Sequence, residues 1–294
     1  MKVVFQCEND PYCTEVLHRH WPGLPRWDDV ETLTGSKVLH RTQFIDVVAW
    51  GSPCQDLSQS GSQLGLAGDD SRLFLEGMRV IREIREATNG RAPRVSVWEN
   101  VPGALRVNGG RDFGAVLDAM AEAGALVIEW RVLDARHTGV PQRRQRVFVV
   151  AVFDPVAARR GPQEILTQPA GPYVNPRPDR QDGWGPEEPA LWVKSRKPSA
   201  SGEPETWVRS RWAPTLVCAD RYLGASSMIT RAGYDIRRCT PLEWERFMGW
   251  PDGWTEGVSD NQRYIQCGNG VVSPVATWVG TKIIELLNGG PNVT

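Results

Sequence analysis

The chain has 294 residues, of which 40% are hydrophobic, and this length suits one large domain or one large and one small domain. Its formal net charge of −1 excludes a globally basic protein, so any contact with nucleic acid needs basic side chains that are gathered locally. The sequence has no run of eighteen apolar residues and no signal-peptide pattern at its start, which predicts a cytoplasmic protein with reduced thiols.

Short apolar segments alternate with helical ones through the first half, which is typical of a parallel sheet covered by helices. The expected strands are 2–7, 44–51, 94–99, 125–133 and 146–153, and the expected helices are 72–88, 111–123, 241–248 and 273–287. After Phe153, proline, glycine and charged residues become frequent. The sequence therefore predicts an α/β fold with a first domain at 1–154, a small irregular region at 155–236, and a segment at 237–294 that returns to the first domain.

A cysteine follows the apolar strand 44–51, in the sequence Gly51-Ser52-Pro53-Cys54. The turn after a buried strand is where α/β enzymes place nucleophiles, and Pro53 fixes the backbone there. The six cysteines include no Cys-x-x-Cys pair and only four histidines are present, so we expect neither a zinc site nor a disulfide framework. We take the other five cysteines as structural.

Two further polar motifs follow strands of the expected sheet. Glu99 ends the strand 94–99, and in a parallel sheet it points to the same rim as Cys54; a lone glutamate after a strand is otherwise usually a surface carboxylate. Residues 131–160 hold seven arginines against two aspartates, which is either a local binding surface or a solvated face. Within this segment, Gln142-Arg143-Arg144-Gln145-Arg146 opens the strand 146–153.

Acidic and glycine-rich segments are candidates for binding a nucleotide-like cofactor. Glu8 follows the first strand, where α/β nucleotide binders place an acid for the ribose hydroxyls, although acids at strand ends are also routine helix caps. Near the C-terminus, Gly268-Asn269-Gly270-Val271 carries two glycines that allow close backbone approach, although a plain turn before a helix would also explain them.

Taken in order, the Pro53-Cys54-Gln55, Glu99-Asn100-Val101-Pro102, Gln142–Arg146 and Gly268–Val272 segments resemble those of the DNA cytosine-5 methyltransferase family. The resemblance covers almost the whole chain and implies an enzyme of the restriction-modification or phage type. It also implies a Rossmann-like S-adenosyl-L-methionine-dependent methyltransferase sheet. The irregular region 155–236 is then the small target-recognition domain, and no metal is expected.

The resemblance also implies the chemistry of the site. Cytosine C5 is a poor nucleophile, and a Cys54 thiolate that adds at C6 activates it toward a methyl sulfonium. Glu99 corresponds to the acid that acts at N3 of the base. Arg144 and Arg146 correspond to a pair of arginines, one contacting the base or the DNA backbone and one orienting the glutamate. A solvent-facing basic strand edge is the alternative for these arginines.

For the cofactor, S-adenosyl-L-methionine, the resemblance assigns Glu8 to the ribose and Asp29 to the adenine edge. Asp28 is a near-equal rival of Asp29 for the second role. Asn269 and Val271 correspond to residues that line the methionine end.

The partner that the resemblance implies is double-stranded DNA, whose target base is flipped into the pocket. Residues 55–70 suit a mobile closing loop, with an ordinary loop as the alternative. Arg237 is expected to pack the recognition region onto the catalytic domain. Basic residues available for guanine edges or phosphates are Lys194, Arg196, Lys197, Arg209 and Arg211.

The chain departs from the family at its start, since it opens on what corresponds to the family's second strand, without a Phe-x-Gly-x-Gly-Gly turn. A different start codon, a truncated gene, or a second polypeptide that supplies the N-terminal element would each account for this, and we expect the chain alone to bind the cofactor weakly. One alternative is a catalytically impaired truncated form or partner subunit that acts as a DNA-binding protein. Another is a tRNA methyltransferase, against which the 155–236 insert and the Pro53-Cys54-Gln55 motif argue.

Overall fold

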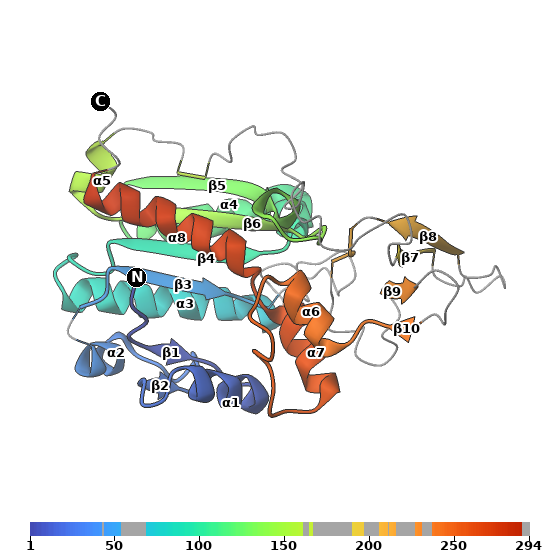
Figure 1. The fold of residues 1–294 in the computed structure, drawn as a ribbon. Helices are drawn as coiled ribbons and strands as arrows, with labels where there is room; N and C mark the ends of the chain where they lie inside the picture. The colour runs from blue at the N-terminus through green and yellow to red at the C-terminus, as the bar shows by residue number, and fades with distance from the viewer. Residues whose placement is uncertain are drawn as a thin grey trace. The chain divides into compact units, whose positions relative to one another are not determined.

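The computed structural model describes residues 1–42, 44–53, 69–160, 165–166, 190–196, 206–210, 212–215, 227–230 and 237–289. The chain divides into two compact units (Figure 1). The first unit comprises Met1–Leu133, Gln145–Pro169 and Trp278–Thr294. The second comprises Asp134–Arg144 and Ala170–Thr277. The division of the sequence at 154 and 236 stays a prediction.

The first unit contains a four-stranded sheet in the order β3-β4-β6-β5. Its strands are β3 (Val47–Gly51), β4 (Val95–Asn100), β5 (Val127–Asp134) and β6 (Gln145–Val152), all within a residue or three of the bounds expected from the apolar runs. β3 and β4 are parallel, as expected, and Gly51 lies opposite Glu99. The chain therefore leaves β3 and β4 at the same rim of the sheet.

The expectation of an all-parallel sheet is wrong for the other half, because β6 runs antiparallel to β4. Hydrogen bonds join Leu126 to Val152 and Ala135 to Arg144, which sets β5 antiparallel to β6. The connection between β5 and β6 is too short for the crossover that parallel strands require, and it contains the 3-10 turn Ala135–Thr138.

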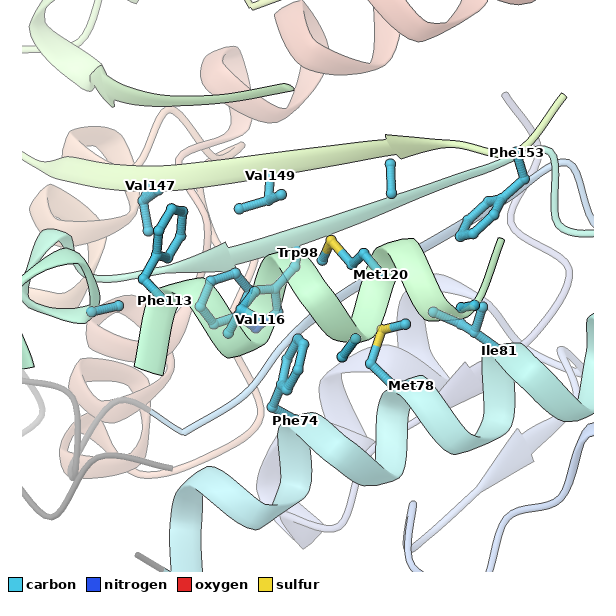
Figure 2. Close-up of a cluster of buried hydrophobic side chains, with 14 residues drawn as sticks. Phe74, Met78, Ile81, Trp98, Phe113, Val116, Met120, Val147, Val149 and Phe153 are labelled. Carbon is cyan, nitrogen blue, oxygen red and sulfur yellow. The ribbon is translucent and has the colours of Figure 1, made fainter. Parts of the chain in front are cut away.

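Helices α3 (Asp69–Ala87) and α4 (Arg111–Glu122) cover one face of this sheet. Figure 2 shows that they meet the sheet through a buried apolar cluster, as their helical spacing of apolar residues predicts. Phe74 and Trp98 pack edge to face in this cluster, with ring centroids 5.3 Å apart. The labelled members of the cluster are Phe74, Met78, Ile81, Trp98, Phe113, Val116, Met120, Val147, Val149 and Phe153.

A separate two-stranded parallel sheet is formed by β1 (Gln6–Cys7) and β2 (Arg26–Trp27). β1 is shorter than the expected strand 2–7, because only Gln6 and Cys7 face partner residues. Around it lie α1 (Pro11–His20) and α2 (Gly35–Arg41), which the apolar pattern did not predict. Both helices begin at polar caps, Asp10 and Thr34.

Among the described residues of the second unit, an antiparallel sheet has the order β10-β9-β7-β8. Part of the region expected to be irregular therefore forms regular strands, which the frequent proline, glycine and charged residues of this region did not indicate. The strands are β7 (Ala190–Arg196), β8 (Thr206–Ser210), β9 (Ser227–Thr230) and β10 (Arg237–Arg238). Lys194 and Arg196 lie in β7 and Arg209 lies in β8, whereas Lys197 and Arg211 lie outside the described residues.

The remaining helices are α5 (Pro155–Arg159), α6 (Pro241–Phe247), α7 (Asp260–Asn269) and α8 (Ser273–Asn288). The stretch Asp260–Asn288 would by length and mean hydropathy be able to cross a membrane. However, it is broken into α7 and α8 between Asn269 and Ser273, and α8 has a buried apolar face. That face consists of Val275, Val279, Ile283 and Leu286.

Candidate active site

The backbone that leads to Cys54 is held by side chains of β4. The indole Nε1 of Trp98 donates to Ser52 Oγ at 3.2 Å, and the Asn100 amide donates to the Ser52 carbonyl at 3.2 Å and to its Oγ at 3.1 Å. Asn100 is itself only 2% exposed, and its Oδ1 accepts from the Val101 amide at 2.8 Å. The turn that ends β3 is therefore fixed up to Pro53. Cys54 and residues 55–68 lie outside the described residues.

Glu99 and Arg146 meet on the opposite face of the sheet from α3 and α4. Glu99 lies opposite Phe148 in the β4–β6 ladder, and Arg146 is two residues from Phe148, so both side chains project from the same face. Arg146 Nε lies 3.1 Å from Glu99 Oε1, and the two side chains are 14% and 17% exposed. Gly51 of β3 lies next to the Glu99 carboxylate, because a Cβ on Gly51 would be 3.5 Å from Glu99 Oε2. As a glycine, it places no side chain over the carboxylate.

Three carboxylates gather at the ends of β1 and β2. Cys7 is an exposed residue whose sulfur is partly buried, and the pKa of its thiol is raised to about 11, first by this partial burial and then by the negative charges of Glu8, Asp29 and Asp28. Because these charges act on one sulfur, the three acids share this end of the small sheet. The arrangement suits a group with several hydroxyls, such as a ribose.

The acids Glu8 and Asp29 are not the helix caps that their positions after strands allow. The N-cap of α1 is Asp10, which accepts from the amides of Tyr12 and Cys13, and the N-cap of α2 is Thr34. Glu8 Oε1 accepts from the Asp10 amide at 2.9 Å, and Asp29 Oδ1 accepts from the Glu31 amide at 2.9 Å. The capping alternative is therefore wrong for both residues, whereas their role in cofactor binding stays a prediction.

In the second unit, Arg144 contacts the segment that carries Asn269 and Val271. The Arg144 side chain is buried, and its Nη2 donates to the carbonyls of Gly268 at 2.8 Å and Gly270 at 2.9 Å. Asn269 is the exposed last residue of α7, and Gly270 is its C-cap. Of the two predicted arginines, Arg146 is therefore the one beside Glu99, and Arg144 is the one beside the Asn269 turn.

The described cysteines differ in environment. Cys267 is fully buried, and burial raises its thiol pKa to about 12. Cys239 is also buried, whereas Cys7 is exposed rather than buried as a structural cysteine is expected to be. Because the thiolate is the nucleophile, the raised pKa values of Cys7 and Cys267 argue against either in that role.

Ser52 and Asn100 are the residues of this rim to which the sequence alone assigned no role. In the sequence, Asn100 is one residue of the Glu99-Asn100-Val101-Pro102 motif. An amide directly after a glutamate at a strand end is the signal that could have identified it, because a buried amide requires a partner. The partner, Ser52, could not be named without the β3–β4 register.

Arg237 connects β10 to the first turn of α6. Its guanidinium makes two hydrogen bonds of 2.8 Å to Glu243, and the Glu243 carboxylate also accepts from the Thr240 amide at 2.8 Å in a capping box. Arg237 thus links the antiparallel sheet to α6 within the second unit, and its expected role between domains stays a prediction.

The solved structures that resemble the chain include the S. pombe Dnmt2 methyltransferase, with a TM-score of 0.64 over 98% of this chain and 92% of that one. At 16% identity this likeness shows the fold alone. The chain thus shares the α/β fold of this methyltransferase, and the α/β class that the sequence predicted is confirmed.

Relatives of known name share the sequence as well. The type II methyltransferase M2.BsuMI of Bacillus subtilis is 28% identical over 294 residues, which are 95% of this chain and 69% of the relative. The type II methyltransferase M.NlaX of Neisseria lactamica is 28% identical over 297 residues, which are 98% of this chain and 90% of the relative. The family model described as C-5 cytosine-specific DNA methylase matches residues 1–173 and 192–285. The chain belongs to this family, and it is a DNA cytosine methyltransferase of the restriction-modification type.

Proposed function

We propose that the chain methylates C5 of a flipped cytosine through a covalent intermediate in which the Cys54 sulfur is bonded to C6. The observation that carries this proposal is the Glu99–Arg146 pair, which lies at the rim where β3 delivers Ser52, Pro53 and then Cys54. A nucleophile and an acid that leave adjacent parallel strands at one rim can act on one ring from neighbouring positions.

The proposed reaction begins at C6 of the flipped cytosine. The Cys54 thiolate forms a bond to C6, and the electron pair of the C5–C6 double bond is displaced through the ring, so that N3 takes up a proton held by Glu99. S-adenosyl-L-methionine, when bound, supplies an electrophilic methyl group. After C5 has taken the methyl group, water accepts the C5 hydrogen as a proton, and the electron pair of that C–H bond expels the Cys54 thiolate. N3 returns its proton to Glu99, so that neutral 5-methylcytosine is released.

In this proposal Arg146 is the residue that orients the glutamate. A guanidinium beside a carboxylate holds it in one plane, and with 17% of the Glu99 side chain exposed, the carboxyl group can still be reached. Gly51 supports this arrangement because the β3 position opposite Glu99 carries no side chain. A base that enters at this rim would meet a carboxyl group whose orientation is already set.

We further propose that Glu8, Asp29, Asn269 and Val271 bind S-adenosyl-L-methionine, with Asp28 as the rival of Asp29. The three carboxylates near Cys7 fit the ribose and adenine edge, and none of Glu8, Asp28 or Asp29 is used as a helix cap. Asn269 is exposed at the end of α7, where its side chain can contact a ligand.

The proposed substrate is double-stranded DNA, and the proposed site of action is the bacterial or phage-infected cytoplasm. Region 155–236 would read the target, with Lys194, Arg196 and Arg209 on the antiparallel strands β7 and β8. Basic strands of this kind can position phosphates and guanine edges.

We also propose that a further strand, from a second polypeptide or a longer form of the chain, pairs with β3. Among the described residues, β3 pairs with β4 alone and β1 with β2 alone, so each sheet has an open edge. Ala49 and Gly51 of β3 are exposed, and Phe44 just before it is 47% exposed. An open apolar edge is a template for another strand.

Calorimetry with S-adenosyl-L-methionine tests the proposal that a further strand pairs with β3. The chain alone should bind weakly, and addition of the strand in cis or as a second polypeptide should restore binding by covering the β3 edge. Tight binding by the chain alone would contradict it.

The covalent step is tested with duplex DNA that contains 5-fluorocytosine, because fluorine at C5 cannot leave as a cation and the adduct is trapped. The chain, with the added strand if it needs one, should form a denaturant-resistant complex with this DNA. Cys54→Ala should abolish the complex, whereas Cys13→Ala, a half-buried cysteine on α1, should retain it. An adduct that survives in Cys54→Ala would contradict the assignment of Cys54 as the nucleophile. DNA binding by the wild type without any adduct would favour the non-catalytic alternative.

A further inference from the structure

The turn between α7 and α8 is held by side chains and backbone from two other segments of the second unit. Its carbonyls at Gly268 and Gly270 accept from Arg144, and its carbonyl at Val271 accepts from the indole Nε1 of Trp250 at 3.1 Å. The amide of Ser273, which follows the turn, donates to the Met248 carbonyl at 2.9 Å.

Arg144 occupies a position where a cation is favoured. The last carbonyls of a helix lack intrahelical donors and carry partial negative charge. Gly268 is in the last turn of α7, and the Arg144 Nη2 atom lies between its carbonyl and that of the C-cap Gly270, at 2.8 and 2.9 Å. Only 3% of the Arg144 residue is exposed, so this guanidinium is used inside the protein rather than presented at the surface.

Trp250 holds the other side of the turn. Its ring lies so close to Gly270 that a Cβ on Gly270 would overlap the indole. This close approach, and not a need for backbone flexibility, explains the glycine at position 270. The preceding Gly249 has a φ of +66°, and a Cβ on it would approach the Pro274 ring at 2.5 Å. Residues 248–250 therefore pack against both the turn and the first turn of α8.

We infer that Arg144 and Trp250 are positioning residues for cofactor binding, which hold the Gly268–Val271 backbone so that Asn269 and Val271 are presented in one conformation. This inference rests on the proposed role of that turn. It gives Arg144 a role apart from the base and the DNA backbone, and it adds Trp250, which no motif had singled out.

The kinetic test uses the chain with the added strand if it needs one, and it separates the effect on cofactor binding from the effect on DNA binding. Arg144→Met removes both hydrogen bonds to the turn and should raise the KM for S-adenosyl-L-methionine on the order of tenfold, with kcat and the KM for DNA changed less than about twofold. Arg144→Lys keeps a cationic donor and should restore part of the affinity. Trp250→Phe keeps most of the ring but loses the donor to Val271, and should raise the same KM severalfold.

Matched controls come from the same unit. Arg246→Lys alters an exposed arginine whose partner is Asp252, and Trp254→Phe removes an indole N–H four residues from Trp250. Both should leave the KM for the cofactor unchanged. An Arg144 variant that raises the KM for DNA, or lowers kcat alone, would overturn the inference, because it would place Arg144 at the base or the phosphates.

Amide hydrogen exchange tests the positioning directly and does not require the cofactor. In the wild type, the Gly270 amide donates to the Gln266 carbonyl at 2.8 Å and the Ser273 amide donates to Met248. Arg144→Met and Trp250→Phe should increase exchange at these two amides and leave the β4 amides protected as in the wild type. Unchanged exchange at the turn would overturn the inference. If the wild type binds no cofactor even with the added strand, while the turn is loosened in the variants, the result would count against the proposed function only.

Discussion

Two rims of the first unit each carry some of the predicted site residues, and these residues are held by different kinds of contact. At the ends of β3 and β4, Asn100 bonds to Ser52 and Glu99 meets Arg146, partners more than forty residues away in the chain. At the ends of β1 and β2, Glu8 and Asp29 accept from amides only two residues away. The geometry of the first rim thus depends on the tertiary structure, whereas much of the geometry of the second rim is set by local turns.

This difference matches the two kinds of task proposed for the rims. Attack on a base and proton transfer at N3 require groups held to fractions of an ångström, and neighbouring strands provide such rigidity. Carboxylates that bind ribose hydroxyls need not be placed as accurately. Changes at the first rim should therefore act mainly on the rate, and changes at the second mainly on local charge and affinity.

Glu99→Gln is the substitution with the largest expected effect on the rate at the first rim. The amide cannot supply the proton at N3, so methyl transfer in a single turnover should fall on the order of 10²–10³-fold. DNA affinity, measured by fluorescence anisotropy, should stay within about twofold because it relies chiefly on phosphate contacts. Glu86→Gln, at an exposed position on α3, is the control. Equal loss of affinity and rate would mean that Glu99 is structural.

Arg146→Lys tests whether the orientation of Glu99 matters beyond its presence. A lysine keeps the charge but loses the planar fork, so the single-turnover rate should fall about 10–100-fold with DNA affinity retained. Arg159→Lys, at an exposed position at the end of α5, should have no effect. If Arg146→Lys lowered DNA affinity and left the rate of bound complex unchanged, Arg146 would be a DNA contact instead.

A double-mutant cycle of Ser52→Ala and Asn100→Ala tests how the nucleophile turn is held. Asn100→Ala leaves the Ser52 carbonyl without its donor and should lower the free energy of unfolding by about 1–3 kcal/mol and the rate by about tenfold. Ser52→Ala removes only the hydroxyl and should cost less. Urea unfolding and single-turnover rates should both show coupling between the two changes, and strict additivity would mean that the residues act independently.

The smallest expected effect concerns Cys7 at the second rim. With a pKa of about 11, roughly one thiol in a thousand is ionised at pH 8, so alkylation by iodoacetamide should be slow although the residue is exposed. The nearby carboxylates raise this pKa, so Glu8→Gln should lower it and speed alkylation a few-fold at pH 8. Glu31→Gln, an exposed acid that does not contribute, is the control. Slower alkylation in Glu8→Gln would show that the charge of Glu8 does not act on the thiol.

Much of the fold could be predicted because long apolar segments follow one period. The strands β3, β4, β5 and β6 and the helices α3, α4, α6 and α8 lie within a few residues of their expected bounds. α7 was missed because Asp260–Asn269 is rich in polar residues and is defined by its Ser259 cap and its packing on α6. α1 was missed for a similar reason, since histidine and arginine fill its last turn.

Local motifs of the sequence by themselves determined the family, the α/β class and the candidates Cys54, Glu99, Arg144, Arg146 and Asn269, because the chemistry of these residues is carried by short segments. Only the tertiary structure decided which of them meet. Arg144 and Arg146 are two residues apart in one motif, yet Arg146 pairs with Glu99 and Arg144 holds the Gly268–Val271 turn. The physical reason is that strand register and helix packing bring together residues far apart in the chain, and no local pattern encodes that pairing.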